Sequence, residues 1–134
     1  MTHSLIQQYR RVDTCGDVET ASPHKLIDML YGGLKIALSD AHGAMQSGHM
    51  AAKGMALGKA LDILQNLQVS LDPQMGGSIA GNLERLYDYM GWRLTEANLK
   101  NDARAVEELL TLTESLRSAW ETIPADQRQG PMAA

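Results

Sequence analysis

The 134-residue sequence has no phenylalanine, a single cysteine and no apolar run long enough to cross a membrane. The one cysteine, Cys15, cannot form an internal disulfide, which suits a reducing compartment. The longest apolar region, Leu26 to Leu38, is interrupted by Asp28 and Lys35 and is too short to span a bilayer. The first residues contain no apolar stretch typical of a signal peptide. We therefore expect a cytoplasmic protein without membrane insertion.

Clustered basic charge is also missing. The chain carries 12 Lys and Arg against 16 Asp and Glu, a net charge of −4, and its bases are scattered without a run. Proteins that bind nucleic acid need clustered cations to neutralise phosphates, so we expect no nucleic-acid partner. Aromatic residues form only 4% of the chain, whereas methionine occurs eight times. Such a composition favours an aliphatic, sulfur-containing core, as in a helical bundle.

Four segments carry apolar residues at steps of three and four, the spacing of amphipathic α-helices. The first helix should begin at Ser22-Pro23, because Ser is a good N-cap and Pro fits the first helical turn, and end near Gly48. The second should run from about Met50 to Leu71. The residues predicted to face the core in these two helices are Leu26, Leu30, Leu34, Ala37, Ala41 and Met45, then Leu57, Leu61, Leu64, Leu67 and Leu71.

A loop with Met75, Gly76 and Gly77 is predicted before the third helix. Asn101 or Asp102 should cap the fourth helix, which Pro124 closes. The predicted core residues of these helices are Ile79, Leu83, Leu86, Met90, Leu94 and Ala97, then Val106, Leu109, Leu110, Leu116, Trp120 and Ile123.

Connections of a few residues force neighbouring helices to be antiparallel, so we expect an all-α, up-down-up-down four-helix bundle. The predicted organisation is a short N-terminal cap segment at 1–19, the bundle at 20–124 and a disordered tail at 125–134. The length suits one domain.

The spacings of known catalytic and metal-binding motifs are absent. No Glu is followed by His three residues later, as a di-metal carboxylate bundle requires. The stretch from Gly54 to Lys59 lacks the glycine spacing and the Ser or Thr of a phosphate loop. His42 and His49 have no Cys or acidic cluster beside them to complete a zinc site, and Cys15 lacks an evident base. We expect no catalytic residue, metal or cofactor, and therefore no enzyme.

A second set of apolar residues lies off the core stripes when each helix is drawn at roughly 100° per residue. Single exposed apolar residues are ordinary, but large ones on the outer faces of three helices predict a groove for an amphipathic partner segment. The glycine pairs Gly54/Gly58 and Gly77/Gly81 either admit another backbone or are simply tolerated. The outer residues are Met29, Ile36, Met55, Val69, Trp92 and Leu99.

Four runs of residues resemble the flagellar secretion chaperones, FliS, in the same order. They are TASPHKLIDMLYGGL from Thr20, KGMALGKALDILQNLQVSLD from Lys53, GGSIAGNLERLYDYM from Gly76 and EANLKNDARAVEELLTLTESLRSAW from Glu96. The resemblance covers Thr20 to Trp120, about three quarters of the chain. Tyr9 also falls where that family carries a tyrosine. One departure is Gly32, which stands where many relatives carry an acidic residue, so any contact of that acid is in question here.

The resemblance implies a chaperone that binds the C-terminal segment of newly made flagellin, blocks premature polymerisation and presents it to the flagellar type III export gate. It also implies that the N-terminal cap near Tyr9 borders the client site. We expect the cap either to cover the groove and move when flagellin arrives, or to belong permanently to the core. The predicted flagellin-binding residues are Ile6, Tyr9, Val12, Met29, Ile36, Met55, Val69, Trp92 and Leu99.

Two alternatives stay open at this point. The chain is either this chaperone or a helical adaptor whose partner is a regulatory protein, and a regulatory protein is also a candidate additional partner of the chaperone. The sequence does not decide between a monomer and a weak homodimer.

Overall fold

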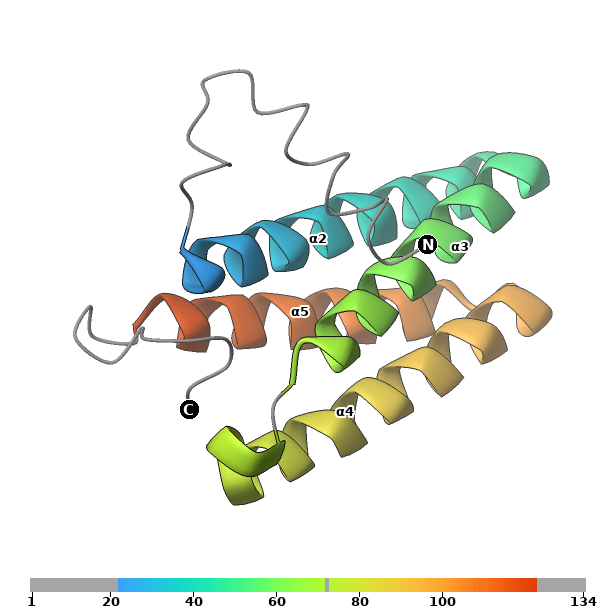
Figure 1. Ribbon diagram of the computed structural model, residues 1–134. Coiled ribbons are helices and arrows are strands. Elements are labelled where there is room, and N and C mark those ends of the chain that lie inside the picture. Colours follow the sequence, from blue (N-terminus) through green and yellow to red (C-terminus); the bar gives the residue numbers. More distant parts are fainter. Residues whose placement is uncertain (1–21, 72, 123–134) are drawn as a thin grey trace.

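The computed structural model describes residues 22–71 and 73–122, with only the helical backbone for 73–78. The predicted cap segment 1–19 and tail 125–134 lie outside the described residues. Within the described part, consecutive helices run in opposite directions and are joined by short connections (Figure 1). The helices are α2 (Pro23–Ser47), α3 (Met50–Val69), α4 (Pro73–Lys100) and α5 (Ala103–Glu121).

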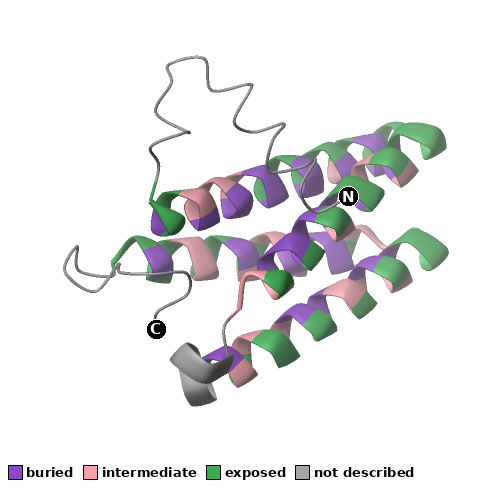
Figure 2. Cartoon of the chain, in the orientation of Figure 1, coloured by how far each residue is buried: buried purple, intermediate pink, exposed green. Residues whose placement is uncertain are grey.

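The four helices close a ring around one core. Helix α2 packs against α3 and α5, and α4 completes the ring by contacting the same two helices. Buried residues follow the inward faces of the helices and exposed residues the outward faces (Figure 2). The predicted all-α up-down-up-down bundle is therefore confirmed.

The helix ends follow from local capping chemistry. The side chain of Ser22 accepts a hydrogen bond from the backbone N–H of Lys25, 3.2 Å away, and Pro23 occupies the first turn of α2. Gly48 ends α2 in a left-handed conformation with φ of 74°, which glycine adopts without steric cost. The carboxylate of Asp102 accepts from the first backbone amides of α5. The predicted boundaries at these three caps are confirmed.

The loop predicted around Met75, Gly76 and Gly77 is wrong. Helix α4 begins at Pro73 and includes these residues, while α3 ends at Val69, two residues before the predicted Leu71. Proline is favoured in a first helical turn because its missing N–H has no intrahelical partner there. The glycines weaken a helix without forbidding it, so the proline decides where α4 starts.

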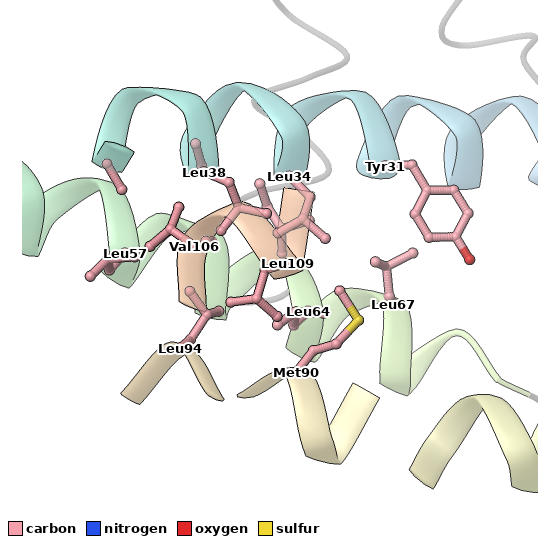
Figure 3. Packing of buried hydrophobic residues seen from close by; sticks show 14 of the residues in the cluster. Tyr31, Leu34, Leu38, Leu57, Leu64, Leu67, Met90, Leu94, Val106 and Leu109 are labelled. Atoms are coloured by element: carbon pink, nitrogen blue, oxygen red, sulfur yellow. The ribbon is translucent and has the colours of Figure 1, made fainter. Parts of the chain in front are cut away.

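The core is aliphatic and sulfur-containing except for Tyr31, Tyr87 and Trp120. Leu34 and Leu38 of α2 point toward Leu109 of α5 and the leucines of α3 (Figure 3). The hydroxyl oxygens of Tyr31 and Tyr87 lie 2.6 Å apart, a hydrogen bond between α2 and α4. Burial raises the pKa of both hydroxyls, so the pair stays neutral.

Helix α4 is covered less completely than α2. Its N-terminal half diverges from the C-terminal half of α5 (Figure 1). Ile79, predicted to be a core residue, is 50% exposed, and Leu83 and Leu86 are half-buried. On α5, Leu112 and Leu116 are half-buried as well. The core position assigned to Ile79 is therefore wrong. The buried residue of that turn is its neighbour Ala80, 3% exposed, so the inward face of α4 runs through Ala80 and not through Ile79.

Candidate protein-binding surface

The apolar residues predicted off the core stripes do lie on the outside of the bundle. Met29 is less exposed than the others, since it is half-buried. Besides Ile79, sequence reasoning missed two exposed residues, Met50 at the start of α3 and Tyr89, whose ring centre lies 5.9 Å from that of Trp92. The exposed fractions of the predicted residues are 63% for Ile36, 79% for Met55, 70% for Val69, 57% for Trp92 and 81% for Leu99.

Two adjoining hollows lie between α3 and α4, and we call them together the α3–α4 groove. Their volumes are about 130 and about 310 Å³, and they share Leu61 and Thr95. Leu61 was predicted to face the core, but it is half-buried and forms part of the groove wall. The remaining lining residues are Gly54, Leu57, Gly58, Leu64, Gln65, Gln68, Tyr87, Asp88, Gly91, Trp92, Leu94 and Asn98.

Glycines keep the α3–α4 groove open. A Cβ added to Gly54 or Gly58 would meet no atom within 4 Å, so the missing side chains leave free space above the helix backbone. Across the groove, a Cβ on Gly91 would lie 3.6 Å from Leu61 Cδ1. The predicted pair Gly54/Gly58 therefore lies where a partner backbone can approach α3 closely.

The polar groups of the groove are mostly uncharged. Gln68 Nε2 donates to Asp88 Oδ1 at 2.8 Å, which joins α3 to α4, and the hydroxyl of Thr95 donates to the carbonyl of Gly91 at 3.1 Å. Gln65 and Asn98 add amide groups to the lining. The groove thus combines leucines and Trp92 with amides, a lining suited to a peptide segment that has apolar and polar faces.

A third hollow, which we call the α2 hollow, has a volume of about 260 Å³. Its lining residues are Met29, Gly32, Gly33, Ile36 and, from α3, Lys59. The structure thus divides the predicted residues. Met29 and Ile36 line the α2 hollow and Trp92 lines the α3–α4 groove, whereas Met55, Val69 and Leu99 are exposed without lining either. Ile6, Tyr9 and Val12 lie outside the described residues.

The face formed by α4 and α5 differs, because its charges are paired with one another. Arg93 contacts Glu96 at 2.6 Å, Glu108 at 2.8 Å and Asp102 at 4.0 Å. Tyr89 donates to Glu108 at 2.5 Å, and this hydrogen bond, followed by that from Arg93, lowers the pKa of the Glu108 carboxyl. A surface whose charges already have partners has less to offer a second protein.

The described residues offer little for catalysis. In residues 22–71 and 73–122 no three His, Cys, Asp or Glu side chains come together in a way that could hold a metal ion. His42 Nε2 pairs with Glu107 at 2.9 Å, and His49 precedes α3 without a capping hydrogen bond from its side chain. No helix in the same part of the chain is long and apolar enough to span a membrane. The features that stand out are the α3–α4 groove and the α2 hollow.

Comparison with known proteins identifies the family. The family model described as flagellar protein FliS matches residues 5–127. The flagellar secretion chaperone FliS of Salmonella typhimurium is 46% identical over 123 residues, which cover 91% of this chain and 91% of that protein. The FliS of Vibrio cholerae is 40% identical over 121 residues, covering 90% and 89% of the two chains. FliSB of Pseudomonas aeruginosa is 41% identical over 118 residues, covering 88% and 94%.

These matches confirm the resemblance found in the sequence and extend it on both sides of residues 20–120. The relatives are secretion chaperones, so the family is not one of enzymes. With the helical bundle and its outer apolar hollows, they lead to one conclusion: the chain belongs to the flagellar protein FliS family.

Proposed function

We propose that this protein binds the C-terminal segment of newly made flagellin in the cytoplasm, prevents its premature polymerisation and delivers it to the flagellar type III export apparatus. The names of the relatives support a role in flagellar secretion. The observation that carries the proposal is the set of large apolar side chains exposed on the outside of the bundle. Among them Trp92, 57% exposed, lines the α3–α4 groove.

The α3–α4 groove is the proposed binding site for a helix of the client. A helix with an apolar face can lay its backbone over Gly54 and Gly58, where no side chain stands in the way. Trp92 then provides a large, rigid contact beside Leu61, as aromatic residues do at the centres of protein interfaces. Binding of this kind recognises the spacing of apolar side chains rather than a unique sequence. It suits a client segment that must later leave the chaperone and pack within another assembly.

The energetics allow both capture and release. A disordered segment that folds on binding typically buries about 1,000–3,000 Å² and loses a few kcal/mol of the gross interaction energy in ordering. Capture therefore shields the apolar client face without making the complex permanent.

The N-terminal segment is proposed to act as a cover. The spacing of Ile6, Tyr9 and Val12 would place them on one face of a short helix, and so short a helix is not stable in water by itself. We expect it to fold over part of the client surface in the free protein and to move when flagellin binds. A chain lacking residues 1–17 should then differ from the full chain in its affinity for flagellin, and equal affinities would remove the cover role.

The central experiment is a calorimetric titration of the full chain with a synthetic peptide of the flagellin C-terminal segment. We expect saturable one-to-one binding. Replacing Met29, Ile36 and Trp92 together by glutamine should abolish it with little loss of thermal stability, since these residues lie on outer faces. No binding to the unmodified chain would refute the proposal, and a collapse of thermal stability would show that these side chains belong to the core.

A matched pair of glycine variants tests the position of the client. Gly58 and Gly43 both have free space around an added Cβ, but only Gly58 lines the groove. Gly58→Leu should weaken peptide binding about tenfold or more by filling the groove, whereas Gly43→Leu should leave it unchanged. Equal affinities of the two variants would place the client helix elsewhere.

A further inference from the structure

The α2 hollow differs in charge from the α3–α4 groove. Its floor consists of Met29, Ile36 and two glycines, and its one charged lining residue is Lys59 of α3. The groove has no cation among its lining residues, and its one charged side chain, Asp88, is bonded to Gln68. The two recesses therefore suit client segments of different chemistry.

Lys59 has no carboxylate partner among residues 22–71 and 73–122, although acids outnumber bases in the chain. Three of the four other lysines of the bundle are engaged, and the fourth, Lys25 in the first turn of α2, lines neither recess. Lys35 lies 3.1 Å from Glu114 and Lys100 lies 3.5 Å from Glu96, while Lys53 is buried and donates to the carbonyl of Asn98. An exposed ammonium beside an apolar floor is thus left for an external anion.

A second cation borders the hollow from the other side of α2. The two Nη atoms of Arg117 lie 3.5 Å from the position that a Cβ of Gly32 would occupy. The guanidinium is paired through Nε with two carboxylates, Asp28 Oδ1 at 3.3 Å and Glu121 Oε1 at 3.5 Å. Because residue 32 is glycine, no side chain separates the guanidinium from the outer face of α2. Because the charge of Arg117 is already paired, the cation that this hollow leaves for a partner is Lys59.

We propose that the α2 hollow binds an amphipathic segment of the client that carries an acidic side chain beside its apolar face. The apolar side chains pack on Met29 and Ile36, and the carboxylate pairs with Lys59. This inference rests on the proposed function, since it takes the client to be flagellin. It goes beyond the proposed function by stating that the client side chain bound beside the α2 hollow is negatively charged.

The test compares charge variants of the full chain in titrations with the synthetic flagellin C-terminal peptide. Lys59→Gln should weaken binding about threefold, and Lys59→Glu about tenfold or more, because repulsion replaces attraction. Both effects should shrink at high salt, which screens exposed charges. Arg104→Glu is the matched control, since Arg104 is an exposed cation of α5 that lines neither recess, and we expect an unchanged affinity.

A charge-reversal rescue identifies the contact. Each acidic residue of the peptide is changed in turn to lysine and titrated against the Lys59→Glu chain. One of these peptides should recover most of the lost affinity, while the same peptide should bind the unmodified chain less well. Thermal unfolding of the Lys59 variants should match that of the unmodified chain, because Lys59 is exposed.

The outcomes separate this inference from the proposed function. If the unmodified chain does not bind the peptide, the proposed function and the inference both fail. If it binds and Lys59→Glu binds equally well, flagellin recognition stands and the acidic contact is refuted. If the loss caused by Lys59→Glu disappears in a chain lacking residues 1–17, the acidic partner of Lys59 is the chain's own N-terminal segment, which also refutes the inference.

Discussion

Helices α2 and α4 carry the same kind of apolar stripe but are covered to different degrees. Along α2 the inward residues are buried from Leu30 to Met45. Along α4 they are buried at Ala80 and from Tyr87 to Ala97, but Leu83 and Leu86 between them are only partly covered. Helix α2 also packs more extensively against its two neighbours than α4 does.

The difference teaches that periodicity and burial are separate properties. A stripe at three- and four-residue steps shows which side of a helix is apolar, while the neighbouring helices decide how much of that side leaves water. The first half of α4 therefore combines a core-like sequence with an incomplete cover. Regions with few buried contacts open locally at lower free energy than the rest of a domain, so we expect the described part of this half to open before the other helices.

The largest expected effect compares two leucine truncations. Leu34→Ala in α2 should lower the free energy of unfolding by about 3–5 kcal/mol, because the side chain is fully buried and leaves a cavity. Leu86→Ala in α4 should cost only about 1–2 kcal/mol, since its side chain is partly in water already. Urea unfolding measures both. Equal losses would mean that α4 is as well covered in solution as α2.

The hydroxyl pair that joins the two helices gives the next effect. Tyr31→Phe or Tyr87→Phe alone leaves one buried hydroxyl without its partner and should cost about 1–3 kcal/mol. The double variant should cost less than the sum of the two, because no unpaired hydroxyl then remains. Additive losses in urea unfolding would show that water reaches the pair from the open side of α4.

A smaller effect comes from glycines within the two helices. Gly43→Ala in α2 should stabilise the bundle by about 0.5–1 kcal/mol, because alanine is the better helix former and has free space there. Gly81→Ala in α4, where only the side chain of Arg85 is near, should add less to the global stability if this half opens first. Thermal unfolding of both variants tells whether the two helices unfold as one unit.

The smallest effect concerns the ion pair between α2 and α5. Lys35 and Glu114 lie 3.1 Å apart with both side chains about half exposed or more. Lys35→Gln should therefore change the free energy of unfolding by less than about 0.5 kcal/mol, and added salt should reduce even that. A loss of more than about 1 kcal/mol in the free energy of unfolding, measured in urea, would mean that charge pairing as well as burial fixes α2 in the bundle.

The elements that could be predicted from the sequence depend on local chemistry. Ser22, Gly48 and Asp102 fix helix ends through hydrogen bonds and backbone conformation within a few residues. The start of α4 was missed because a glycine-rich stretch follows Pro73, and two local signals of opposite meaning compete there. Ile79 and Ala80 are adjacent apolar residues, and only Ala80 is buried. Which of the two faces inward is decided by the packing of α4 against its neighbours, which no local pattern contains.

The binding surface shows the same division. The outward direction of Ile36, Met55 and Trp92 follows from helix geometry alone, and the sequence predicts it. Their assignment to separate recesses depends on contacts between distant segments. Lys59 enters the α2 hollow from another helix, and the guanidinium of Arg117 reaches Gly32 from the end of the chain's last helix. Neither contact has a signature in the spacing of residues.

The two tryptophans have a practical consequence. Trp120 is buried, stacks on His24 with ring centres 4.6 Å apart and donates its indole N–H to the His24 carbonyl, whereas Trp92 stands at the edge of the groove in contact with solvent. The protein thus carries two intrinsic fluorophores in opposite environments. A ligand that covers the groove should shift the fluorescence emission of Trp92 to shorter wavelength and leave that of Trp120 unchanged. A single spectrum of the unlabelled protein then reports both whether the groove is occupied and whether the bundle is folded.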